Sequence, residues 1–222
     1  EMIQKSVEKV VMGNEKKSLR MTEHEKRLTA IHEIGHAIVG KMLAHTDPVH
    51  KISILPRGGA GGVTWFLPEK DRTYTSKAKY LDELATLYGG RVAEEVFFGP
   101  EYITTGASSD IERATEIARA MVMRFGFDPE IGPENLAPDM SEGNFSVEVK
   151  SKVISDKTQD LIDAKVRELL RAAYAQAKQI ITSNRDLHEK IANELLTREE
   201  MLEDEFDAFF EGLAGVPAKV AM

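Results

Sequence analysis

Two histidines and a glutamate carry the clearest chemical meaning in this sequence. His32, Glu33 and His36 form the pattern His-Glu-x-x-His, in a stretch whose apolar spacing predicts a helix. Residues four apart lie on the same helix face, so the two imidazoles can bind one metal ion. Glu33 can then accept a proton from a water molecule at that metal. The pattern is typical of zinc hydrolases.

The helix that positions this pattern is expected over residues 22–45. Thr22 and Glu25 form a capping box, which predicts that the helix starts there. Gly35 costs about 1 kcal/mol of helix stability relative to alanine, so we expect a packing or functional reason for it. A mostly apolar stripe follows the cap, made of Leu28, Ile31, Ile34, Ile38 and Leu43.

A catalytic zinc site usually has three protein ligands, so a third must come from elsewhere in the chain. The residues three and six positions after His36 are not the glycine and histidine of a metzincin, which excludes that class. Spacing alone leaves two alternatives open: Asp110, in the first turn of a predicted helix, and Glu94 or Glu95 on the helix before it. Asp110 could instead simply stabilise its helix dipole. The remaining histidines have no partner at ligand spacing and are expected on the surface or in the core: His24, His45, His50 and His188.

The composition limits the class of protein. A chain of 222 residues with 42% hydrophobic and 30% charged residues can form a soluble domain with a substantial core. The net charge of -8, with no basic block, argues against nucleic acid as a partner. The absence of cysteine excludes disulfides and thiol catalysis. No apolar run is long enough to span a membrane, and no signal peptide is visible.

The remaining pattern predicts a mainly α-helical fold with a small β-hairpin or sheet. Two β-like runs flank a glycine-rich turn and predict a hairpin at about 50–68. Capping boxes at Ser109 and Thr197 mark two helix starts. The expected helices lie at 76–98, 109–125, 155–183, 185–195 and 198–211. We divide the chain into residues 1–21, a catalytic region at 22–148 with a flexible loop at 126–148, a helical region of the same domain at 149–213, and a disordered tail at 214–222.

Five segments of this sequence resemble the FtsH family of membrane-anchored, ATP-dependent zinc proteases. They lie at residues 29–37, 47–58, 87–95, 104–111 and 124–127, and the resemblance covers roughly residues 5–210, although the loop at 127–146 follows it loosely. The resemblance implies a helical zinc-protease domain with one Zn²⁺ per chain. It places the third ligand at Asp110, beside His32 and His36, with Glu33 as the general base. Glu94 and Glu95 would then support the site or the fold.

The same resemblance implies partners for this domain. It implies a homohexameric ring, unfolded or membrane proteins as substrates, and an N-terminal AAA+ ATPase module preceded by membrane segments. No Gly-x-x-x-x-Gly-Lys-Ser/Thr occurs, so we expect ATP to be used by that module and not bound here. Residues 1–21 are then the junction from the ATPase. The full-length protein would be membrane-anchored, with this domain, itself soluble, on the cytoplasmic, matrix or stromal side.

The hairpin offers a route for substrate binding. An exposed strand at Gly62, Val63, Thr64 and Trp65 could pair with an extended peptide, which suits a zinc endopeptidase that degrades unfolded chains. Alternatively, the strand lies in the core with Trp65 and Phe66 on opposite faces. Two other functions stay open: a catalytically silent module that forms the ring, and a free-standing soluble metallopeptidase.

Overall fold

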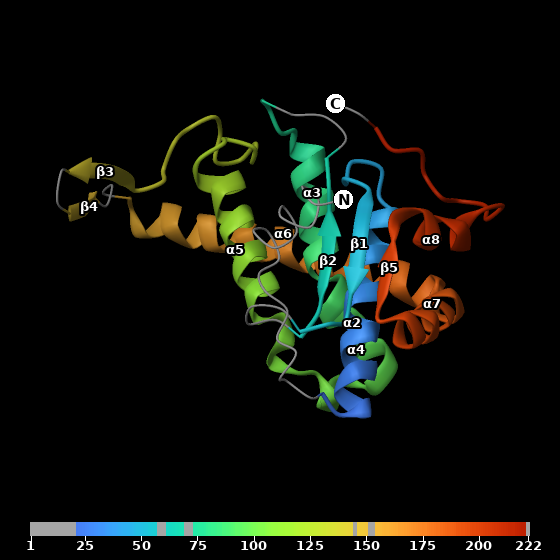
Figure 1. Cartoon of the computed structure of the whole chain (residues 1–222). Coiled ribbons are helices and arrows are strands. Elements are labelled where there is room, and N and C mark those ends of the chain that lie inside the picture. Colours follow the sequence, from blue (N-terminus) through green and yellow to red (C-terminus); the bar gives the residue numbers. More distant parts are fainter. Residues whose placement is uncertain (1–20, 57–60, 69–72, 144–145, 151–153, 221–222) are drawn as a thin grey trace.

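The computed structural model describes residues 21–56, 61–68, 73–143, 146–150 and 154–220, so the expected junction lies outside the described residues apart from Met21. The described chain is mainly helical with a small antiparallel sheet, which confirms the predicted fold class (Figure 1). The α-helices are α2 (Glu23–Lys41), α3 (Lys77–Leu87), α4 (Gly89–Phe98), α5 (Ser108–Met123), α6 (Asp156–Ser183), α7 (Arg185–Arg198) and α8 (Glu203–Asp207). The 3-10 helices are η1 (Pro100–Tyr102), η2 (Thr105–Ala107) and η3 (Ala208–Phe210). The strands are β1 (Val49–Ser53), β2 (Val63–Phe66), β3 (Asp139–Gly143), β4 (Ser146–Lys150) and β5 (Glu200–Leu202).

Helix α2 is the centre of the fold. Its predicted capping box is present: Glu25 N donates to Thr22 Oγ1 at 3.2 Å, and Thr22 N donates to Glu25 Oε2 at 2.7 Å. Residues 29–40 are all buried, because α3, α4, α6, α7 and β1 pack around the helix. The helix ends at Lys41, four residues before the predicted end. The metal-binding pattern therefore lies in the core, where neighbouring elements fix its side chains.

The helix predicted over 76–98 is two helices, α3 and α4, with Tyr88 between them. This break brings the start of α4 against α2. A Cβ added to Gly35 would lie 2.4 Å from Gly89 O, and one added to Gly89 would lie 2.6 Å from Gly35 O. The two backbones thus touch, which only glycine allows on both sides. The packing reason expected for Gly35 is this contact.

The sheet has the antiparallel order β2-β1-β5, which leaves β2 at an edge (Figure 1). Ile52 in β1 lies opposite Thr64 in β2 and Met201 in β5. The predicted hairpin is therefore one side of a three-stranded sheet. Its third strand comes from a segment that the sequence predicts as helix.

The prediction of a helix over 198–211 is wrong. Helix α7 continues to Arg198, and Thr197 donates to Asn193 O inside it instead of capping a new helix. Glu199 adopts a left-handed conformation with φ of 63°, which ends α7 and directs β5 onto β1. Only α8 and η3 follow. Pairing with β1 satisfies the backbone of this segment and overrides its local helix signal.

Strands β3 and β4 pair antiparallel, so the prediction of a flexible loop over 126–148 is wrong for the residues of these strands. Figure 1 shows these two strands beyond the start of α6, far from the sheet. Helix α6 matches its predicted range, with Ser155 as N-cap, and packs on α3, α4 and α5. The regions at 22–148 and 149–213 therefore share one core. None of the described helices is long and apolar enough to cross a membrane.

The tail predicted as disordered is instead anchored, over its described residues, to the end of α2. Lys219 Nζ donates to Gly40 O at 2.6 Å and to Leu43 O at 2.8 Å. Val220 N donates to Ala44 O at 2.8 Å. The ammonium group thus satisfies carbonyl groups at the negative end of the helix.

Candidate metal centre

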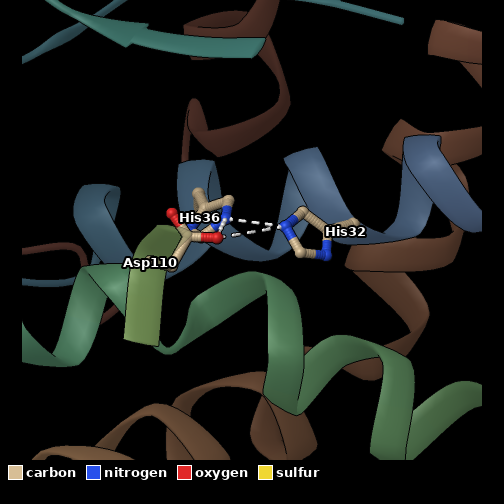
Figure 2. A group of neighbouring side chains, drawn as sticks. All are labelled: His32, His36 and Asp110. Carbon is tan, nitrogen blue, oxygen red and sulfur yellow. Dashed lines mark hydrogen bonds and ion pairs between the residues drawn. The ribbon is translucent and has the colours of Figure 1, made fainter. Parts of the chain in front are cut away.

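Three side chains predicted as zinc ligands converge on one point (Figure 2). His32 and His36 project from α2, and Asp110 projects from the first turn of α5. The Nε2 atoms of the two histidines are 3.1 Å apart, and each lies 3.6 Å from Asp110 Oδ2. Ligand atoms about 2.0–2.1 Å from a tetrahedral zinc ion are about 3.3 Å apart. The three atoms therefore have the spacing of three corners of a zinc tetrahedron.

The hydrogen bonds of the outer ring nitrogens favour metal binding as well. His36 Nδ1 lies 2.8 Å from Thr86 O, and a carbonyl only accepts, so Nδ1 carries the proton. His32 Nδ1 lies 2.7 Å from Glu94 Oε1 and donates to that carboxylate. In the neutral rings both Nε2 lone pairs then face the common point. Two buried acceptors this close require a cation between them.

Glu94 is an orienting residue in this arrangement. Its side chain is fully buried, and Oε2 accepts the backbone N–H of Thr104 at 2.6 Å while Oε1 accepts His32 Nδ1. Neither oxygen is directed at the point where the ligand atoms meet. Glu95 lies elsewhere, where it accepts hydrogen bonds from Tyr174 and, at 2.8 Å, from Lys178 Nζ. The structure thus brings Asp110, and neither glutamate, to the point that the two Nε2 atoms face.

The pKa values show how strongly the centre attracts positive charge. Burial lowers the pKa of His32, but hydrogen bonds with Asp110 and Glu94 outweigh it and raise this pKa to about 10. Burial raises the pKa of Asp110, yet the two histidines hold it well below its usual range. Burial also raises the pKa of Glu94, but hydrogen bonds from His32 and Thr104 outweigh this effect and hold the pKa below its usual value. Both carboxylates stay ionised, so a proton or a metal ion is held at this centre.

A backbone approach from α4 sets the position of the His32 ring. A Cβ added to Gly90 would lie 2.3 Å from His32 Nε2 and 2.5 Å from its Cδ2 and Cε1. The ring therefore lies flush against the main chain of α4. The sequence signal was the Gly89–Gly90 pair, which can mark a close approach of two backbones, but its partner in space is not readable from the chain.

Glu33 follows His32 in the chain and contacts strand β2. It is buried, and Thr64 Oγ1 donates to its Oε2 at 2.7 Å. A cavity of about 800 Å³ runs over this region, and its lining includes the His32, His36 and Asp110 cluster, Glu33, Gly62, Val63 and Thr64. Trp65 lies on the other face of β2, with its ring edge-on to His50 at a centroid distance of 4.7 Å. Three of the four residues predicted to bind substrate therefore line the cavity.

Two other histidines take structural positions. His188 is fully buried, and its Nε2 donates to Ile31 O at 2.8 Å. Burial lowers the pKa of His188 to about 4. His45 is partly exposed and contacts Asp82 Oδ2 at 2.9 Å. Neither takes part in the convergence of ligand atoms.

Two imidazoles and a carboxylate at tetrahedral spacing, with a glutamate beside them on a buried helix, are typical of a zinc metallopeptidase. The comparison with known families agrees with this class, because the protein-family model described as Peptidase family M41 matches residues 19–209. The chain belongs to Peptidase family M41. The resemblance to FtsH proteases is thereby confirmed.

Curated proteins named as ATP-dependent zinc metalloproteases match most of this chain. A protein named ATP-dependent zinc metalloprotease FtsH, from Cupriavidus metallidurans, is 47% identical over 189 residues, which cover 85% of this chain and 29% of the relative. A protein of the same name from Caldicellulosiruptor bescii is 42% identical over 207 residues, or 93% of this chain and 33% of the relative. ATP-dependent zinc metalloprotease FTSH 5, chloroplastic, from Arabidopsis thaliana is 44% identical over 214 residues, or 94% and 30%. The chain spans about a third of the length of these relatives.

Proposed function

We propose that this chain is a zinc endopeptidase domain in which His32, His36 and Asp110 hold the metal ion. The observation that carries the proposal is the convergence of three ligand atoms at separations of 3.1 and 3.6 Å. The relatives named zinc metalloproteases support the choice of zinc. A bound zinc ion supplies a water molecule of lowered pKa and polarises the scissile carbonyl.

The residues of the chain supply the proton transfers. Glu33 accepts the proton of the attacking water through its carboxylate and then donates it to the nitrogen of the departing amine. Glu94 and the Thr86 carbonyl keep the Nδ1 protons of the two histidines in place, so that Nε2 of each ring stays available as a ligand. The buried surroundings of α2 keep competing water away from these groups.

Strand β2 is the proposed site of substrate pairing. It lies at one edge of the sheet, and Gly62, Val63 and Thr64 line the cavity above the proposed metal centre. An extended peptide that pairs with this edge is read through its main chain, which tolerates many sequences. Peptides with alternate N-methylated amides should therefore bind more weakly than their unmodified counterparts. Equal binding of both would contradict strand pairing.

The whole protein is proposed to be larger than this chain. The names of the relatives support an ATP-dependent protease, and their greater length leaves room for the ATPase module that this sequence lacks. With the resemblance to FtsH, this supports a membrane-anchored homohexamer whose ATPase delivers unfolded chains to the peptidase domain. A silent assembly module and a free-standing peptidase are less favoured, because the complete ligand set and the ATP-dependent relatives argue against them.

The first experiment tests catalysis. Glu33→Gln should abolish cleavage of an unfolded protein such as casein and leave one zinc ion per chain, because the amide cannot accept the proton. Retained cleavage would contradict the role of Glu33. The variant should unfold at the same urea concentration as the wild type, which separates loss of chemistry from loss of fold.

The second experiment tests the third ligand. Asp110→Ala should lose most of its zinc by elemental analysis, whereas Glu95→Ala, which removes a carboxylate that lies elsewhere, should keep it. Equal zinc in Asp110→Ala and the wild type would return the ligand role to another residue.

A further inference from the structure

A hydroxyl on strand β2, that of Thr64, contacts the proposed general base Glu33. Thr64 Oγ1 lies 2.7 Å from Glu33 Oε2 and 2.9 Å from Glu33 O. A hydroxyl has one proton to donate, and an ionised carboxylate is the stronger acceptor of the two. The contact joins strand β2 to helix α2 at the residue that must move a proton.

The second oxygen of Glu33 has a different neighbour. Gly62 immediately precedes β2 and lies two residues before Thr64. A Cβ added to Gly62 would lie 2.8 Å from Glu33 Oε1. Thr64 therefore binds Oε2 through its hydroxyl, and Gly62 lies against Oε1 without a side chain. A carboxylate fixed in this way keeps the lone pairs of Oε1 for a proton from water.

We propose that Thr64 is a positioning residue that holds the Glu33 carboxylate by its Oε2 and leaves Oε1 to act as the base. This inference rests on the proposed peptidase function. It gives β2 a second role beside substrate pairing, because the strand whose backbone pairs with the peptide also orients the base. A competing explanation is that the Thr64 hydroxyl only ties β2 to α2 through the carbonyl of Glu33.

The test compares Thr64→Val, which removes the hydroxyl at nearly constant shape, with Thr64→Ser, which keeps it. Loss of a hydrogen bond to a charged group should lower kcat for peptide cleavage by about 10- to 100-fold in Thr64→Val, with little change in KM. Thr64→Ser should restore most of the rate. Thr197→Val removes a hydroxyl that donates to a helix carbonyl in α7 and should keep the wild-type rate.

Binding and fluorescence distinguish positioning from a structural tie. Trp65 is the only tryptophan and adjoins Thr64, so its emission reports on β2. In Thr64→Val, zinc content, Trp65 emission and the Kd for an unmodified peptide should match the wild type. A lower kcat together with shifted emission, weaker peptide binding or lost zinc would overturn the inference. An unchanged kcat in Thr64→Val would also overturn it. So would a kcat that Thr64→Ser does not restore. A wild type without zinc-dependent cleavage would overturn the proposed function as well, whereas an active wild type and an unchanged Thr64→Val would overturn only the inference.

Discussion

Gly90→Ala should disable the metal centre without altering any ligand. The new Cβ would lie 2.3 Å from His32 Nε2, whereas a relaxed contact between such atoms is about 3.5 Å, so the ring must move by about 1 Å. A zinc–nitrogen bond of 2.0–2.1 Å tolerates only about 0.2 Å. The ring cannot move freely, because it is buried and its Nδ1 donates to Glu94.

The expected loss of zinc affinity is at least as large as that caused by removing a hydrogen-bond partner of a metal ligand. We expect zinc affinity to fall by about 100-fold or more, which corresponds to about 2.7 kcal/mol. Competition against a chromophoric chelator gives the Kd directly. Urea unfolding of the metal-free proteins should show a change of at most about 3 kcal/mol, because the His32–Glu94 hydrogen bond is the main interaction affected.

Gly106→Ala is the matched control for this prediction. Its Cβ would lie 3.7 Å from Glu94 Oε1, an ordinary contact, and Thr104 Oγ1 is its nearest neighbour at 3.2 Å. This variant adds a methyl group close to the site without meeting His32, so its zinc Kd should stay within about threefold of the wild type. A wild-type Kd in Gly90→Ala would refute the position of the His32 ring or its role as a ligand.

Three further predictions follow from contacts around α2. Glu94→Gln removes the charge that holds the Nδ1 proton of His32. The zinc Kd should therefore rise by about 10- to 100-fold in the same chelator competition. An unchanged Kd would mean that packing alone orients the ring. The pKa of His188 is about 4 in the folded protein, against an ordinary value of 6.5. As the pH falls, the unfolded chain therefore binds a proton at this residue that the folded protein does not bind. The free energy of unfolding should drop by about 2 kcal/mol between pH 7 and 5. Urea unfolding of His188→Gln should lack this contribution, and an equal pH dependence in both proteins would contradict it. Lys219→Met removes the donor to Gly40 O and Leu43 O and should lower the free energy of unfolding by about 1 kcal/mol, while the exposed Lys157→Met should not.

Local sequence signals predicted the parts of the structure that are decided locally. The predicted Thr22–Glu25 capping box is present, because it depends on residues within one turn. The box predicted at Ser109 fails, since η2 leads directly into α5 and the helix begins at Ser108 with no side-chain cap. The box at Thr197 fails because a distant strand, β1, pairs with the segment that follows.

The sequence predicted the arrangement of the candidate site only in part. Helical spacing alone places His32 and His36 together, and it also allows Glu33 to lie beside them. It could not separate Asp110 from Glu94, since the choice depends on how α4 and α5 approach α2 in space. The contact between Gly35 and Gly89 sets that approach and leaves Glu94 behind His32, facing Nδ1. The link from Thr64 to Glu33 depends in the same way on where the sheet crosses α2.

The order of the sheet also governs the order in which the parts of this domain can pack during synthesis. Strand β1 is made before its partner β5 and before the helix α7 that covers α2. Until then β1 has an open edge and the ligand-bearing helix lacks part of its cover. A nascent chain can thus carry every residue of the metal centre without the packing that holds them in place. The packing of the metal centre is therefore complete only after α7 and β5 have been made.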